Sequence, residues 1–148
     1  QFNKVEMFQY TTEEQDAKAF EELVGKAISL MEKLGLTFRV SKLAAEDISA
    51  SMARTYDIEV YIPSVGIFKE VSSVSTAHDY QARRGMIRYR EKATGKVKYA
   101  HTLNGSGLAT SRIFPALVEQ YQQPDGSIVV PEVLRPFMGG ISVIKPIK

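Results

Sequence analysis

The clearest pattern in this chain is a helical repeat of apolar residues near its start. They recur at intervals of three and four: Phe20, Leu23, Val24, Ala27, Ile28, Met31 and Leu34. This spacing predicts an amphipathic helix that ends at Gly35. Thr11 with Glu14, or Thr12 with Gln15, can form a capping box at its beginning.

Alternating apolar and polar residues predict strands on both sides of this helix. The predicted strands cover residues 2–10, 37–43, 56–63, 68–75, 87–91 and 97–104. The turns at 63–66 and 94–95 join the last four strands into two hairpins. Further helices are predicted over 78–84 and 107–122, and short extended pieces over 128–130 and 141–144, while residues 44–54 are ambiguous. Strands joined by hairpins with helices inserted between them indicate one α+β domain over 1–148, with a mainly antiparallel sheet.

Charged residues lie on strand faces that would otherwise be apolar. In the first strand Phe2, Lys4, Glu6 and Phe8 share a face. Charges are costly to bury, so this face is expected to meet a polar cavity. In the strand 56–63, Asp57 and Glu59 point away from the side of Ile58, Val60 and Ile62.

Composition narrows the kinds of site that are possible. Hydrophobic residues make up 44% of the 148 residues and charged residues 24%, with a net charge of +2. Cysteine is absent, and His78 and His101 are the two histidines, so a zinc site is not expected. No apolar run approaches membrane-spanning length and no signal peptide is visible, which favours an intracellular protein.

Residues 101–112, HTLNGSGLATSR, hold the most distinctive chemistry. A strand that delivers amide and hydroxyl groups and Arg112 to the start of a helix suits a small polar ligand and a phosphate.

Three blocks together resemble the C-terminal half of the catalytic domain of seryl-tRNA synthetases, which are class II enzymes. They are FNKVE at 2–6, EVSS at 70–73 with DYQARR at 79–84, and HTLNGSGLA at 101–109 with Arg112, continuing into PEVLRPFMGG at 131–140. The resemblance implies a class II antiparallel sheet flanked by helices and incomplete at the N-terminus. It also implies a cytoplasmic homodimer in the intact protein (mitochondrial is possible in a eukaryote).

The resemblance implies serine–tRNA ligation, in which ATP activates L-serine to seryl-adenylate and the seryl group passes to tRNA(Ser), and possibly to selenocysteine tRNA. Arg112 and Glu70 are implied as catalytic residues, and Mg²⁺ as the metal, held by Glu70 and Ser73. The implied ATP site contains Phe2, Glu70, Val71, Ser72, Ser73 and Arg112, with Phe2 stacked on adenine. The implied serine site contains Glu6, Asn104 and Ser106, with Glu6 on the ammonium group.

The match has limits. The family's upstream ATP-gripping residues and its tRNA-binding arm have no counterpart, so the 148 residues alone are expected to activate serine negligibly. Thr76 and Ala45-Glu46-Asp47 depart from the usual pattern, and Pro115 is expected to kink the helix after Arg112.

Two other interpretations stay open. The first is a catalytically inactive relative that serves as an RNA- or protein-interaction module, and the second is an unrelated α+β domain. The basic run at 83–98 suits either tRNA phosphates or the solvated face of a hairpin.

Overall fold

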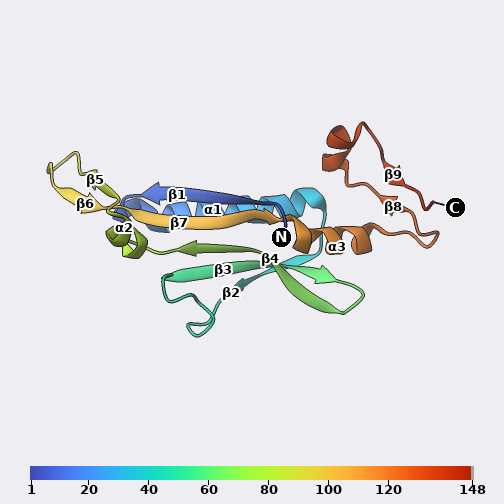
Figure 1. Cartoon of the computed structure of the whole chain (residues 1–148), viewed down its shortest axis with the longest axis horizontal. Helices are drawn as coiled ribbons and strands as arrows, with labels where there is room; N and C mark the ends of the chain where they lie inside the picture. Colours follow the sequence, from blue (N-terminus) through green and yellow to red (C-terminus); the bar gives the residue numbers. More distant parts are fainter. Residues whose placement is uncertain (148) are drawn as a thin grey trace.

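A five-stranded antiparallel sheet organises the computed structural model, which describes residues 1–147 (Figure 1). The strand order is β1-β7-β4-β3-β2. The strands are β1 (Lys4–Thr11), β2 (Phe38–Lys42), β3 (Arg54–Ile62), β4 (Ile67–Thr76) and β7 (His101–Ala109). The predicted α+β architecture with an antiparallel sheet is therefore confirmed.

Helix α1 (Glu13–Leu34) forms where the apolar spacing predicts it. Of the two predicted capping boxes, the one between Thr12 and Gln15 is present, with Gln15 Oε1 accepting from Thr12 N at 3.3 Å. Gly35 ends the helix in the left-handed conformation, at φ 65°.

The hydrophobic core joins α1 and a second long helix, α3 (Thr110–Tyr121), to one side of the sheet. Its largest fully buried side chains include Phe20, Leu23, Met31, Ile58, Leu103 and Val74. Ile113 and Ala116 add α3 to the same cluster. Because the helices occupy the apolar side, the polar residues of β1, β7, β4 and β3 gather on the opposite side.

A β-bulge interrupts the hairpin of β3 and β4. Asp57 pairs with Ser73 and Ile58 with Ser72, but the next residue, Glu59, pairs with Glu70. Val71 is therefore the extra residue, and the alternation of β4 changes phase there.

Several predicted boundaries differ from the structure, and three of them differ because of strand pairing. The first strand begins at Lys4, since Phe2 precedes the residues that pair with β7. The predicted strand 97–104 is divided at Ala100 into β6 (Val97–Tyr99), which pairs with β5 (Arg88–Arg90), and β7, which enters the main sheet. The helix predicted from 107 begins at Thr110, because 107–109 remain in β7 and Ala109 pairs with Lys4.

The remaining elements lie at the two ends of the sheet. Helix α2 (Tyr80–Gly85) and the β5–β6 hairpin are at one end, and the C-terminal segment extends beyond α3 at the other (Figure 1). That segment contains β8 (Ile128–Val129), which pairs with β9 (Val143–Ile144), and the 3-10 helix η1 (Glu132–Met138). The ambiguous residues 44–53 form turns without a helix or strand.

Helix α3 continues on both sides of Pro115, so Arg112 and Pro115 belong to the same helix. No helix within residues 1–147 is both long enough and apolar enough to cross a membrane.

Candidate functional site

Four polar side chains meet between the neighbouring strands β1 and β7, and we call them the β1–β7 cluster: Lys4, Glu6, Asn104 and Ser106. Glu6 is at its centre and pairs in register with Ser106. Asn104 Nδ2 donates to Glu6 Oε1 at 3.0 Å, and Ser106 Oγ donates to Glu6 Oε2 at 3.0 Å. Lys4 Nζ lies 2.8 Å from Glu6 Oε2. The structure thus brings together all three residues of the predicted serine site.

These contacts control the ionisation of Glu6. Partial burial acts to raise its pKa, but hydrogen bonds from Asn104, Lys4 and Ser106, with the charge of Lys4, outweigh that effect. The pKa of Glu6 therefore lies below its ordinary value. The Glu6 carboxylate is therefore both charged and held in a fixed orientation, and these two properties suit it to bind a small cation.

A second group, which we call the β3–β4 cluster, contains Asp57, Glu70, Ser73 and Arg112. Asp57 and Glu59 are two residues apart on β3 and share a face, and their partners on β4 are Ser73 and Glu70. Glu70 and Ser73 therefore lie on one face, although an odd separation of three would put them on opposite faces of a regular strand. The bulge at Val71 is what allows both to contact one ligand.

Arg112 reaches this cluster from the first turn of α3. Its Nη1 lies 3.0 Å from Glu70 Oε1, and the two side chains are 46% and 40% exposed. An ion pair this exposed contributes little to stability, about 0–1 kcal/mol. Both groups are accessible to a ligand that offers stronger charges.

The two clusters lie side by side on the polar face of the sheet. Asn104 pairs with Ser75 across β7 and β4, so alternation puts Ser73 and Asn104 on the same face. Ser72 Oγ donates to the backbone oxygen of Ser106 at 2.6 Å and ties the two strands at this point.

Among the predicted ATP-site residues, Val71 and Ser72 have buried side chains that do not lie on the polar face of the sheet. Each is 1% exposed, with Val71 in the hydrophobic core and the Ser72 hydroxyl bound to Ser106. Any contribution that they make to a ligand on the polar face is through backbone atoms.

Phe2, predicted to stack on adenine, is half exposed and precedes β1. The backbone oxygen of the neighbouring Asn3 accepts a hydrogen bond from Thr110 Oγ1 at 2.5 Å. This bond ties the segment to the first residue of α3, Thr110, which is two residues before Arg112.

Sequence reasoning did not identify Asp57 as a site residue. It is 8% exposed, and its Oδ1 has no hydrogen-bond partner within residues 1–147. Burial raises the pKa of Asp57, and the neighbouring Ser73 hydroxyl and the charge of Arg112 offset part of that rise. Alternation put Asp57 and Glu59 on one face, but it did not show that Glu59 is paired with Arg39 whereas Asp57 is buried opposite Ser73.

The donor set of Glu70 and Ser73 fits Mg²⁺. A carboxylate and a hydroxyl are the hard oxygen donors that Mg²⁺ prefers, and it usually takes its other ligands from water and substrate phosphates. Within residues 1–147 no three His, Asp or Glu side chains are grouped as metal ligands. A cation here would therefore depend on oxygens of a bound phosphate compound.

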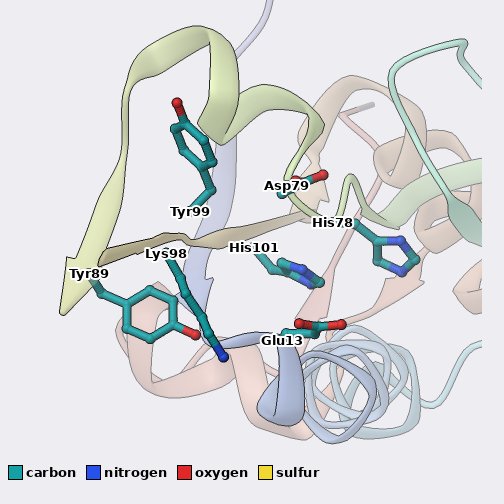
Figure 2. A pocket seen from close by; sticks show the side chains of 7 residues that line it. All are labelled: Glu13, His78, Asp79, Tyr89, Lys98, Tyr99 and His101. Carbon is teal, nitrogen blue, oxygen red and sulfur yellow. The ribbon is translucent and has the colours of Figure 1, made fainter. Parts of the chain in front are cut away.

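A cavity of about 480 Å³ lies away from both clusters, where β7 begins (Figure 2). It is lined by Glu13, His78, Asp79, Tyr89, Lys98, Tyr99 and His101. Both of these histidines also approach the buried Asp16, with His101 Nδ1 3.2 Å from Oδ1 and His78 Nε2 3.6 Å from Oδ2. None of the predicted site residues lines it.

Several cations of the basic run at 83–98 bind groups within or beside the same hairpin and helix. Arg83 pairs with Asp79, Arg90 Nη1 donates to Gly95 O at 2.7 Å, and Lys98 Nζ lies 2.6 Å from Glu91 Oε1. These contacts are typical of the solvated face of a hairpin, and contact with tRNA stays a prediction.

Comparisons with known proteins show the family to which the chain belongs. Residues 1–121 match the family described as tRNA synthetase class II core domain (G, H, P, S and T). The chain is 65% identical over 139 residues to serine–tRNA ligase 2 of Clostridium acetobutylicum, covering 94% of this chain and 33% of that protein.

Two solved structures share the fold over nearly the whole chain. Seryl-tRNA synthetase from Pyrococcus horikoshii, complexed with ATP, matches with a TM-score of 0.94 and 37% identity over 99% of this chain and 33% of its own. Cytoplasmic serine–tRNA ligase from Naegleria fowleri, in complex with AMP, matches with a TM-score of 0.89 and 34% identity over 97% of this chain and 34% of its own. The chain thus spans about a third of these relatives, and it belongs to the class II tRNA synthetase core-domain family.

Proposed function

We propose that the protein containing this chain is a serine–tRNA ligase, which activates L-serine with ATP and transfers the seryl group to tRNA(Ser). The observation that carries this proposal is the position of the two clusters on one sheet face, joined by the hydrogen bond from Ser72 to Ser106. One cluster holds an ionised carboxylate, and the other presents an arginine, a carboxylate and a hydroxyl. The relatives described above support the same function.

The β1–β7 cluster would bind serine. Glu6 would accept the ammonium group, in competition with Lys4, which occupies one side of the carboxylate. Asn104 uses its Nδ2 and Ser106 its hydroxyl hydrogen on Glu6, so Asn104 Oδ1 and Ser106 Oγ are the acceptors available to a substrate hydroxyl. Alanine would leave such acceptors unpaired, and a site of this kind rejects it strongly.

The β3–β4 cluster would bind the phosphates of ATP. In the first step the serine carboxylate attacks the α-phosphorus and pyrophosphate leaves, giving seryl-adenylate. Arg112 would stabilise the charge on the phosphate in transit, because its guanidinium group stays charged and donates in a planar fork. Glu70 and Ser73 would hold Mg²⁺, which supplies positive charge to the phosphates when bound.

Adenine would stack on Phe2, and the backbone of Val71 and Ser72 would line the nucleotide. In the second step the seryl group passes to the 3′-terminal adenosine of tRNA(Ser). Selenocysteine tRNA as a second acceptor, a homodimeric assembly and a cytoplasmic location belong to the same proposal.

ATP–pyrophosphate exchange in the full-length protein tests this function. Exchange should depend on serine, should be far weaker with alanine, and should fall in Glu70→Ala. No serine-dependent exchange above that of Glu70→Ala would overturn the proposal.

The alternative is a catalytically inactive relative that acts as an interaction module, and the exposed basic hairpin is the feature that favours it. A seryl-adenylate analogue distinguishes the two functions. Tight binding by the full-length protein, lost in Glu6→Gln, would support the ligase, whereas no binding would favour the module.

A further inference from the structure

Asp57 is a buried carboxylate of the polar face to which the proposed function gives no role. It is 8% exposed, and its Oδ1 is buried without a hydrogen-bond partner in the described part of the chain. Burying an uncompensated carboxylate is costly, so buried acids are normally paired or bound to a metal. The position of Asp57 therefore needs an explanation that strand propensity does not provide.

Neighbouring cations supply only part of that explanation, because the charge of Arg112 acts on Asp57 without forming an ion pair with it. Arg39, on β2 beside Glu59, pairs with Glu59 rather than with Asp57. Arg112 pairs with Glu70. Among residues 1–147, Asp57 takes part in none of the ion pairs, although two arginines lie on this side of the sheet.

The register puts Asp57 directly opposite Ser73. The two residues are partners in the β3–β4 hairpin, and Ser41 is the partner of Asp57 on the other side. A hydroxyl that gives its hydrogen to a carboxylate keeps its lone pairs free and becomes a better ligand.

We propose that Asp57 is a positioning residue for the cation site: its carboxylate takes the hydroxyl hydrogen of Ser73 and so directs the Ser73 oxygen to a divalent cation held with Glu70 and substrate phosphate. This inference rests on the proposed function, because it needs a cation at Glu70 and Ser73. It also explains the buried charge, since a nearby cation offsets the cost of burying the Asp57 carboxylate.

The test measures cation binding rather than turnover. Mn²⁺, which is visible by electron paramagnetic resonance, is titrated into the full-length protein in the presence of a non-hydrolysable ATP analogue. Asp57→Asn should weaken Mn²⁺ binding about 10-fold, the usual lower range for losing a group that orients a metal ligand. Glu59→Gln is the matched control. It removes the same charge two residues away on the same face and should change binding less than about twofold, because Glu59 is paired with Arg39.

A double-mutant cycle separates positioning from general electrostatics. If Asp57 acts through Ser73, adding Asp57→Asn to Ser73→Ala should cause no further loss of Mn²⁺ affinity. Losses that multiply in the double variant, or an equal loss in Glu59→Gln, would overturn the proposal. Thermal unfolding shows whether each variant is folded. If Asp57→Asn does not fold, Asp57→Glu replaces it in the same cycle. The same loss of Mn²⁺ affinity is expected for Asp57→Glu, because the longer side chain displaces the carboxylate.

Glu70→Ala distinguishes the two proposals. A loss of Mn²⁺ binding in Glu70→Ala with wild-type binding in Asp57→Asn would overturn the role of Asp57 alone. Wild-type binding in both variants would overturn the cation site itself, and the role of Asp57 with it.

Discussion

The β1–β7 and β3–β4 clusters lie on the same face of one sheet, yet they satisfy their charges in opposite ways. Glu6 has three partners within its own cluster, and its side chain is 20% exposed. In the β3–β4 cluster, Asp57 has a buried oxygen with no hydrogen-bond partner among residues 1–147, and Glu70 and Arg112 form an exposed pair.

This difference indicates what each cluster needs from its ligands. Contacts within the β1–β7 cluster already order Glu6, and this preorganisation would lower the entropic cost of binding the proposed substrate, serine. In the β3–β4 cluster, the proposed phosphate and cation would compete for the exposed Glu70–Arg112 pair and balance the buried Asp57. Four predictions test this contrast in the full-length protein, beginning with the largest expected effect.

Arg112→Ala should abolish most activity without affecting stability. We expect ATP–pyrophosphate exchange to fall about 10²–10³-fold, the usual loss for one preorganised charge at a reacting centre. The midpoint of thermal unfolding should change little because the ion pair with Glu70 is exposed. Arg39→Ala removes another exposed arginine from this side of the sheet and should leave exchange unchanged. A large drop in the unfolding midpoint of Arg112→Ala would show that the β3–β4 cluster is structural.

Ser106→Ala should impair serine binding and spare ATP. The variant loses a hydrogen bond to an ionised group, worth about 1.5–3 kcal/mol, so kcat/KM for serine should fall about 10–100-fold. The KM for ATP should stay within about twofold in the same steady-state measurements. Thr102→Val, which removes a hydroxyl from β7 outside the cluster, should leave both constants unchanged. Equal losses for serine and ATP would contradict the division between the clusters.

Ser72→Ala should weaken the connection between the clusters. The Ser72 hydroxyl is buried and donates to the Ser106 carbonyl, so its removal should cost about 1–3 kcal/mol in the free energy of unfolding. Urea denaturation measures this loss. Ser49→Ala, in an exposed turn, is the comparison and should cost less than about 0.5 kcal/mol. If Ser72→Ala is as stable as wild type, this hydrogen bond does not hold the two strands together.

Lowering the pH should remove the contribution of Glu6 to the free energy of unfolding. We expect this to be the smallest of the four effects. The folded-state pKa of Glu6 is lowered, so its contribution is complete above the unfolded pKa of about 4.3 and is lost as pH falls through the folded value. The difference in free energy of unfolding between wild type and Glu6→Gln should therefore be constant from pH 7 to about 5 and shrink below that. Urea denaturation at several pH values measures it, and a difference that grows on acidification would contradict the lowered pKa.

Much of the scaffold could be predicted because it depends on local rules. Thr12, Gln15, the apolar spacing and Gly35 all lie within α1 and mark its beginning, its buried side and its end. The β3–β4 hairpin is likewise built from neighbouring residues around the turn at 63–66. The predicted serine-site residues Glu6, Asn104 and Ser106 could be named because the resemblance rests on contiguous motifs.

Other features depend on strands that are distant in sequence. Residues 107–109 look like the start of a helix, but pairing of Ala109 with Lys4 keeps them in β7. The continuous strand predicted over 97–104 is divided at Ala100, because the residues on either side pair with different sheets. Local propensity contains no information about either partner.

The sequence by itself determined α1, the antiparallel hairpins and the set of polar residues from which a site could be built. Only the tertiary structure decided how those residues face one another. The bulge at Val71 puts Glu70 and Ser73 on one face, and the pairing with Ser73 makes Asp57 a buried neighbour of the site while Glu59 is neutralised by Arg39. Alternation assigns faces only while the register is constant, and register is set by partners that the chain meets only on folding.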